Sequence, residues 1–169
     1  MNTPAGTSAP VQAPDPAFSL PVVAAPIRRR ATAEWAGTFP DGAGRLSTFS
    51  HALEAQPYSA DSRFRTEDGI PGTNPEELLA AAHASCYSMA LAGRLSAAGL
   101  VPEAIRVDTV ATLEQVDGLF TITLVELFVE ARVSDVTRQQ FQALVAEAGQ
   151  RCVITRALRA EVRMTATLV

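Results

Sequence analysis

A chain of 169 residues with 47% hydrophobic content can bury one substantial core, so one folded domain is expected. The net charge of -4 argues against nucleic acid or an anionic membrane as a partner, and the absence of lysine excludes Schiff-base chemistry and a Walker-type phosphate loop. Two cysteines are too few for a secreted disulfide scaffold, and no apolar run reaches the roughly 18 residues of a membrane span. A cytoplasmic protein is therefore expected.

The first 27 residues differ in composition from the rest of the chain. Residues 1–26 hold six of the eleven prolines and a single charged residue, Asp15. The start has no basic region and prolines interrupt each apolar run, so we do not expect a signal peptide. This composition predicts a disordered or loosely packed tail over residues 1–27 and one domain over residues 28–169.

A strand-like pattern begins near residue 31. Residues 31–39 and 45–50 flank a turn rich in glycine, and together they predict a hairpin. Residues 51–58 predict a third strand. Residues 59–72 are polar and turn-rich, and they predict a loop.

A long apolar helix is the main predicted element. Thr73 or Asn74 can cap its start, Pro75 suits the first helical position, and Glu76 adds negative charge to the first turn. Gly99 is the expected end, which gives a length of roughly 35–40 Å. A helix this apolar is expected to be buried on nearly every side, with one of the two cysteines at its middle.

The rest of the chain alternates strands with one further helix. Residues 105–114 and 119–133 predict strands joined by an Asp-Gly turn. Residues 134–149 predict a helix capped by Ser134-Asp135, and residues 160–168 predict a final strand. This order favours an α+β fold with antiparallel sheets over a repeating βαβ unit.

Cysteine and histidine supply the candidate chemistry. Cys86 taken alone has an even chance or better of being inert packing, and the same holds for Cys152. His83, three residues before Cys86, could act as a base or as a metal ligand. Such a histidine is, about three times as often, a hydrogen-bonded core residue. A zinc site would need His51 together with these three residues, and their spacing matches no compact ligand motif. We expect no metal and no cofactor.

Arg63 and Glu76 have ordinary explanations when each is considered alone. An arginine in a polar loop is usually solvated, and a first-turn glutamate complements the helix dipole. Neither residue alone would justify a functional assignment.

Four segments of the chain nevertheless form one pattern. They are Pro57-Tyr58, Ser62-Arg63-Phe64, Gly72-Thr73-Asn74-Pro75-Glu76-Glu77-Leu78 and Ala81-Ala82-His83-Ala84-Ser85-Cys86-Tyr87-Ser88-Met89-Ala90-Leu91. This pattern resembles the signature of the OsmC/Ohr family of thiol-dependent peroxidases that act on organic hydroperoxides, and its OsmC branch in particular. The resemblance extends over nearly everything after residue 28.

The resemblance implies a role for each matching residue. Cys86 is expected to be the peroxidatic cysteine and Cys152 the resolving cysteine, while Arg63 and Glu76 activate the thiol. Val153 stands where the family often has proline, which should alter the local turn. The family also implies antiparallel sheets around a long central helix, an intertwined homodimer, and an external dithiol reductant, which for some members is a lipoylated protein.

Physical chemistry agrees with these roles and adds a constraint. A thiolate cleaves the O–O bond, and burial raises the pKa of a cysteine, so Cys86 needs a positive neighbour such as Arg63, which Glu76 would hold in place. Glu76 and Cys86 are ten residues apart, or roughly 15 Å along one helix. One arginine cannot easily reach both, so we expect a homodimer in which a second chain supplies Glu76 to the Cys86 of the first, and the reverse by symmetry.

Reduction of organic hydroperoxides in oxidative and osmotic stress defence is the predicted function. The alternative is a binding or structural protein of the same fold without peroxidase turnover, in which the cysteines pack or form a static disulfide. A general disulfide reductase is a weaker third possibility, because the chain has no CxxC motif. No residue identifies the physiological peroxide or reductant.

Overall fold

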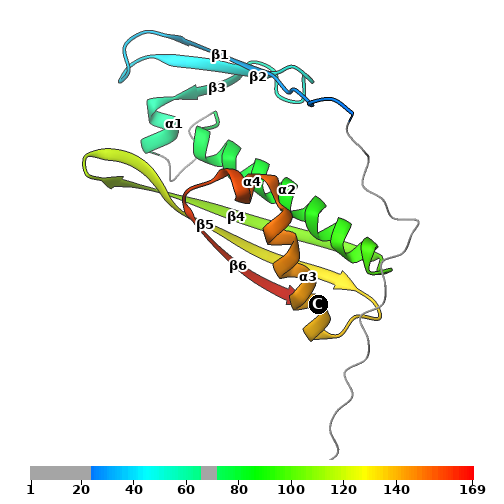
Figure 1. Ribbon diagram of the computed structural model, residues 1–169. Coiled ribbons are helices and arrows are strands. Elements are labelled where there is room, and N and C mark those ends of the chain that lie inside the picture. Colours follow the sequence, from blue (N-terminus) through cyan, green and yellow to red (C-terminus); the bar gives the residue numbers. More distant parts are fainter. Residues whose placement is uncertain (1–23, 66–71) are drawn as a thin grey trace, which may run out of the picture.

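The computed structural model describes residues 24–65 and 72–169. Most of the expected tail, and Glu67 and Asp68 of the expected loop, lie outside the described residues. Ten elements follow one another along the chain (Figure 1). They are β1 (Ala31–Ala36), β2 (Ala43–Thr48), β3 (Gln56–Ser59), α1 (Ala60–Phe64), α2 (Pro75–Ala97), β4 (Pro102–Val116), β5 (Leu119–Val133), α3 (Arg138–Arg151), α4 (Val153–Ala157) and β6 (Glu161–Leu168).

The N-terminal strands form a small antiparallel sheet in the order β1-β2-β3, as predicted. Gly44 pairs with Trp35 on one side and with Tyr58 on the other, and a Cβ atom at this glycine would overlap the Tyr58 ring. The sheet lies apart from the second sheet (Figure 1), and β1 is exposed along its whole length. It therefore buries little surface within its own chain.

The second sheet has the order β4-β5-β6. β4 and β5 form a long hairpin whose turn residues, Asp117 and Gly118, both have positive φ angles, as a type I′ turn requires. β6 pairs with β5 in parallel, so the expectation of antiparallel sheets is wrong for the last strand. The reason is the connection: α3 and α4 carry the chain across the sheet, and such a crossover returns a strand in the same direction.

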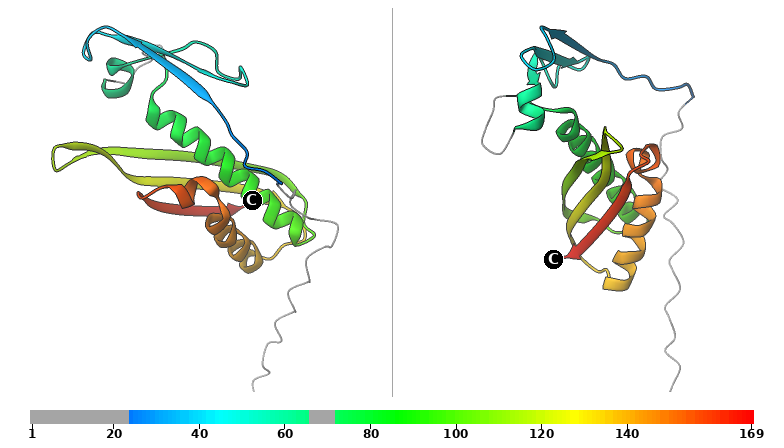
Figure 2. Two further views of the ribbon diagram at one scale, coloured as in Figure 1. Left: turned by 45° about the horizontal axis from the view of Figure 1, so that its top comes forward. Right: turned by 90° about the vertical axis from the view of Figure 1, so that its left-hand side faces the viewer.

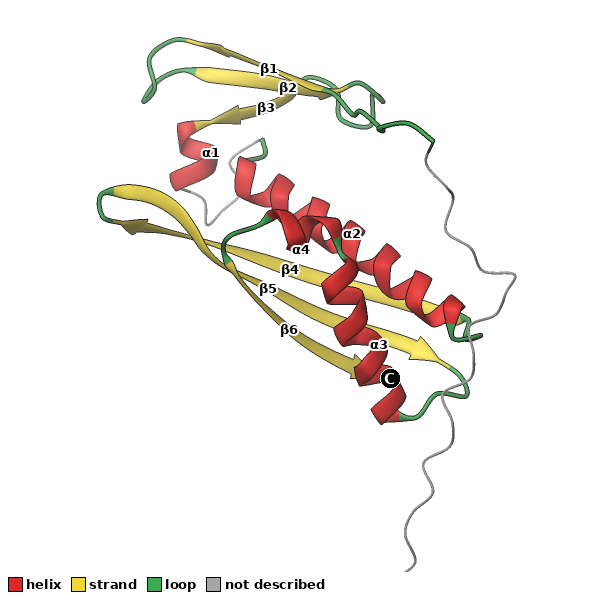
Figure 3. Cartoon of the chain, in the orientation of Figure 1, coloured by secondary structure: helices red, strands yellow, loops and turns green. Residues whose placement is uncertain are grey.

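Two helices cover one face of the second sheet. α2 and α3 lie side by side on it, and α4 follows α3 near the middle of α2 (Figures 2 and 3). Alternate residues of β5 point into this layer, since a strand presents every second side chain to one face. The buried core consists of Tyr87, Leu91, Leu95, Val125, Leu127, Val129, Ala131, Val133, Phe141, Val145, Ala148 and Cys152.

The long helix α2 is less buried than its composition suggests. Its start agrees with the prediction, because the Asn74 side chain accepts a hydrogen bond from the backbone N–H of Glu77. Only one stripe faces the sheet, however, while Ala82 on another face is exposed and Met89 is 74% exposed. The expectation of burial on nearly every side is therefore wrong for a single chain, because the sheet, α3 and α4 together cover only part of the circumference of α2.

Two local features also differ from the prediction. The expected loop after residue 59 contains the short helix α1, which begins with a capping box between Ser59 and Ser62. The cap of α3 is Thr137, which accepts from the backbone N–H of Gln140, and the Ser134-Asp135 pair precedes it.

Among the described residues, no helix combines the length and apolar character that crossing a bilayer requires.

Candidate active site

The first part of the site forms where α1 meets the start of α2. Ser62 is buried, and its hydroxyl donates to the backbone carbonyl of Thr73 at 2.9 Å. The Asn74 side-chain amide donates back to the carbonyl of Ser62 at 3.2 Å. These bonds hold the two helices together, so the neighbours Arg63 and Glu76 face each other.

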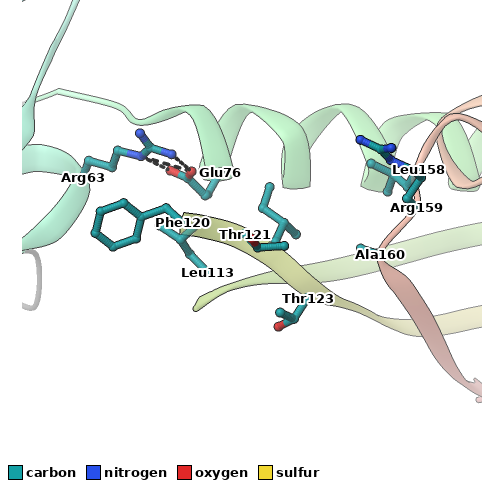
Figure 4. Close-up of a pocket in the computed structure, with 10 residues that line it drawn as sticks. Arg63, Glu76, Leu113, Phe120, Thr121, Thr123, Leu158, Arg159 and Ala160 are labelled. Atoms are coloured by element: carbon teal, nitrogen blue, oxygen red, sulfur yellow. Dashed lines mark hydrogen bonds and ion pairs between the residues drawn. The ribbon is translucent and has the colours of Figure 1, made fainter. Parts of the chain in front are cut away.

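Arg63 and Glu76 form a bidentate ion pair within one chain. The Arg63 Nε lies 3.1 Å from Glu76 Oε1, and its terminal nitrogen lies 2.6 Å from the same oxygen (Figure 4). The guanidinium also lies over the Phe64 ring, 5.0 Å from its centre. Such a fork restrains both side chains, and here it borders a cavity of about 620 Å³ between the start of α2, the β4–β5 hairpin and residues 158–160, which precede β6.

The two cysteines form the second part of the site. Cys86 lies in the middle of α2, and Cys152 lies at the junction between α3 and α4. Their sulfur atoms are 3.2 Å apart, and both are free thiols. Cys152 is fully buried whereas Cys86 is half-buried, so a reagent from solvent reaches Cys86 first.

The environments of the two thiols shift their pKa values in opposite directions. Burial raises the pKa of Cys86, and Cys152 adds to the rise, against backbone donors of Ile154 and Val153. Burial alone would also raise the pKa of Cys152, but the side chain and backbone of Thr155, the thiol of Cys86 and the backbone of Ile154 together outweigh it and lower that pKa. Arg63 is not among the groups that act on Cys86.

The structure therefore brings the four predicted residues together as two pairs. Glu76 and Cys86 are ten residues apart on the continuous helix α2, or about 15 Å along its axis. Arg63 stays with Glu76 at the start of that helix. The expected contact between Arg63 and Cys86 is not made within one chain.

His83 is a buried, hydrogen-bonded residue, which is the alternative that the sequence favoured. Its side chain is fully buried, and its Nε2 lies 2.8 Å from the hydroxyl of Thr155 on α4. Burial lowers the pKa of His83. Sequence reasoning missed Thr155; its place three residues after Cys152 was the available signal.

An apolar hollow opens beside Cys86. It has a volume of about 280 Å³ and lies between the middle of α2 and the ends of α3 and α4. Its lining consists of Cys86, Met89, Ala90, Gly93, Arg94, Arg151 and Val153. The half-buried thiol therefore faces a space that an alkyl group can enter.

The residues that a zinc site would need do not gather. His51 lies in the exposed loop between β2 and β3, where its Nδ1 is 3.9 Å from a carboxylate oxygen of Glu54. Over residues 24–65 and 72–169, no group of three or more His, Cys, Asp or Glu side chains is placed to hold a metal ion.

Comparison with known proteins gives the class of the chain. A family model described as OsmC-like protein matches residues 66–167. Peroxiredoxin OsmC of Escherichia coli (strain K12) is 38% identical over 138 residues, which cover 82% of this chain and 94% of that protein. An organic hydroperoxide resistance protein of Xanthomonas axonopodis pv. citri (strain 306) is 34% identical over 126 residues, which cover 74% of this chain and 85% of that protein.

Solved structures share the fold. An organic hydroperoxide resistance protein from Elizabethkingia anophelis matches with a TM-score of 0.68 at 23% identity, over 87% of this chain and 100% of that chain. An OsmC-like protein of unknown function from Vibrio cholerae matches with a TM-score of 0.68 at 19% identity, over 83% of this chain and 99% of that chain. The chain belongs to the OsmC-like family. Its named relatives are of peroxidase type, and this chain shares that general class.

Proposed function

We propose that this protein reduces organic hydroperoxides to alcohols, with Cys86 as the attacking thiol and Cys152 as the resolving thiol. The observation that carries the proposal is the 3.2 Å separation between a reachable sulfur and a fully buried one. The names of the relatives support a peroxide substrate and a role in stress defence.

The first step is attack by the Cys86 thiolate on the hydroperoxide. A sulfur–oxygen bond forms, the O–O bond breaks, and the departing alkoxide takes a proton to leave as an alcohol. Cys86 is oxidised to a sulfenic acid by two electrons. The apolar hollow beside Cys86 suits the carbon chain of an organic hydroperoxide better than hydrogen peroxide.

The second step joins the two sulfurs. The Cys152 sulfur attacks the sulfenic sulfur, and one water molecule is lost as the disulfide forms. A disulfide needs sulfurs about 2.05 Å apart, so a small movement from 3.2 Å is sufficient. An external dithiol then reduces the disulfide by exchange, and a lipoylated protein is one candidate. A cytoplasmic location is part of this proposal.

Arg63 and Glu76 enter the proposal through a second chain. Burial raises the pKa of Cys86, so the thiolate needs a cation, and the Arg63 of the same chain pairs with Glu76 about 15 Å along α2. A homodimer would bring the Arg63–Glu76 pair of one chain to the cysteines of the other. The pair would act as a unit, whereas the sequence alone suggested Glu76 as the group from the second chain.

Unburied surfaces within the chain support a homodimer. The sheet β1–β3 leaves β1 exposed, and α2 leaves small and apolar residues exposed beside the active cysteine. A second copy packed on these faces would bury both. A monomeric mass in sedimentation of fully active protein would contradict the homodimer.

Peroxide consumption with a dithiol reductant tests the function. Cumene hydroperoxide and dihydrolipoamide should support steady turnover, Cys86→Ser should abolish it, and Cys152→Ser should consume about one equivalent of peroxide and then stop. Cys152→Ser is the matched control, because it keeps the first thiol and removes only the second. If the parent protein forms no sulfenic acid on challenge with peroxide, the binding or structural alternative replaces the peroxidase.

A further inference from the structure

His83 is a buried polar side chain that the proposed chemistry has not used. It lies on the buried stripe of α2, with no exposed surface, and Nε2 has one partner, the Thr155 hydroxyl on α4 at 2.8 Å. Its other nitrogen, Nδ1, is buried without a hydrogen-bond partner among the described residues. Buried polar side chains normally have a hydrogen-bond partner, so the contact with Thr155 accounts for a histidine at this buried position.

The unpartnered nitrogen indicates where the proton lies. Burial lowers the pKa of His83, so the ring is neutral near pH 7 and carries one N–H. A buried N–H without an acceptor is rarer in proteins than an unused lone pair. We therefore assign the proton to Nε2, which donates to the Thr155 oxygen and leaves the hydroxyl hydrogen of Thr155 free to donate elsewhere.

The group that can receive this hydrogen is Cys152. Thr155 and Cys152 are three residues apart at the start of α4, as His83 and Cys86 are on α2. The contacts His83–Thr155 and Cys152–Cys86 bring these two pairs together, so the Thr155 hydroxyl lies on the same helical turn as the Cys152 sulfur, and the polar groups of Thr155 lower the pKa of Cys152. The Cys152 side chain makes no capping hydrogen bond at the start of α4, so its sulfur can still accept from the Thr155 hydroxyl. The Cys152 sulfur in turn lies 3.2 Å from Cys86. His83, Thr155, Cys152 and Cys86 thus follow one another in space.

We propose that His83 and Thr155 are positioning residues for the resolving cysteine: His83 orients the Thr155 hydroxyl, and that hydroxyl stabilises Cys152 as a thiolate. This inference rests on the proposed function and deepens it. His83 and Thr155 would stabilise the thiolate of Cys152, whereas the Arg63–Glu76 pair is proposed to stabilise the thiolate of Cys86.

A stabilised Cys152 thiolate serves both later steps of the cycle. In resolution its electron pair forms the S–S bond, the S–O bond of the sulfenic acid breaks, and hydroxide takes a proton to leave as water. In reduction the external dithiol attacks Cys86, since Cys152 is fully buried, and Cys152 leaves as a thiolate into the same hydrogen bond. The second thiol of the reductant then releases Cys86.

Single-turnover kinetics separate this role from the first step. With excess cumene hydroperoxide, Thr155→Val should leave the rate of sulfenic acid formation within about twofold and slow disulfide formation by about tenfold, as expected for loss of one hydrogen bond to a charged group. Thr155→Ser keeps the hydroxyl and should retain the disulfide rate. His83→Leu should resemble Thr155→Val, and His83→Gln, which can still donate, should recover part of the rate.

A direct measurement of Cys152 keeps the proposal falsifiable if the His83 variants fold poorly. In a Cys86→Ser background, the ultraviolet absorbance of the thiolate gives the Cys152 pKa, and Thr155→Val should raise that pKa while Thr155→Ser should not. An unchanged pKa together with an unchanged disulfide rate in Thr155→Val would overturn the inference. Failure of the parent protein to form any sulfenic acid would instead overturn the proposed function.

Discussion

Arg63 presents its guanidinium to both carboxylate oxygens of Glu76, in a pair that is partly buried. The bonds between Ser62, Thr73 and Asn74 fix the two backbones that carry it. A guanidinium held in this way would need no rearrangement of its side chain to stabilise charge on the thiol of a second chain. Such preorganisation is a requirement for electrostatic stabilisation of a developing charge.

Removal of the Arg63 charge should therefore impair catalysis at Cys86. Arg63→Met is expected to lower kcat/KM for an organic hydroperoxide by about 10²-fold, because the thiolate and the departing alkoxide lose their cation. Arg65→Met is the matched control, since Arg65 belongs to the same turn but pairs with Asp61 on the surface. Equal kinetics for the two variants would contradict the role of Arg63.

The buried His83 should make stability depend on pH. Its folded pKa lies below the ordinary value of 6.5, so the unfolded chain binds a proton there that the folded chain does not. The free energy of unfolding is then highest above about pH 6.5 and decreases, by at most about 1.4 kcal/mol per pH unit, as the pH falls from that value through the folded pKa.

His83→Gln should flatten this dependence. Urea unfolding at fixed protein concentration, followed between about pH 7.5 and 5.5, measures it. His51→Gln is the control, because it removes an exposed histidine from the loop between β2 and β3. A His83→Gln protein with the full slope would show that the dependence arises elsewhere.

At the level of elements, the crossover from β5 to β6 determines where Cys152 lies. α3 packs against α2 and the sheet, and its last residue precedes Cys152 directly. α4 then places Thr155 next to His83 of α2. The position of the Cys152 sulfur thus depends on how α3 and α4 pack against α2.

The cap of α3 provides a test at this level. Thr137→Ala should lower the free energy of unfolding by about 1 kcal/mol, because the side chain satisfies the backbone N–H of Gln140. Ser134→Ala is expected to cost much less, since Ser134 makes only an exposed hydrogen bond to Glu103. Chemical denaturation of the two variants compares the caps, and a larger effect at Ser134 would show that the helix begins there in solution.

The whole molecule leaves surfaces that one chain does not bury. The sheet β1–β3 lies away from the core (Figures 1 and 2), and Cys86 is half-buried on α2, where nearby residues such as Met89 are exposed. Aromatic contacts connect that sheet to the β4–β5 hairpin, through Phe39, Phe64 and Phe120. These surfaces border the Arg63–Glu76 pair, so a second copy on them would also complete the sites.

Mixed dimers test whether the sites are composite. Co-expression of Cys86→Ser with Arg63→Met gives chains that are each inactive, but a mixed dimer would hold one intact site out of two. Random association should then restore about a quarter of the parent activity. Cys86→Ser mixed with Cys152→Ser is the negative control, because both cysteines of a site come from one chain. Lack of recovery in the first mixture would place Arg63 and Cys86 in the same chain's site.

Much of the architecture followed from local signals in the sequence. The Asn74 cap, Pro75 and the uninterrupted run to Ala97 predicted α2, and the alternating strands and the Asp-Gly turn predicted the two sheets. The family signature, carried by residues close together in the chain, predicted the class that the comparisons show. These features depend on backbone preferences and short-range spacing, which a single sequence records.

Other features required the folded chain. The helix α1 rests on hydrogen bonds to Thr73 and Asn74 beyond the loop that follows it. The parallel pairing of β6 depends on the path of its crossover, and the Arg63–Glu76 contact depends on the packing of α1 against α2. The 3.2 Å approach of the two sulfurs and the His83–Thr155 bond join residues 66 and 72 positions apart. Contacts over such separations arise from the packing of whole elements, so the sequence alone determined which residues are present and only the tertiary structure decided which of them meet.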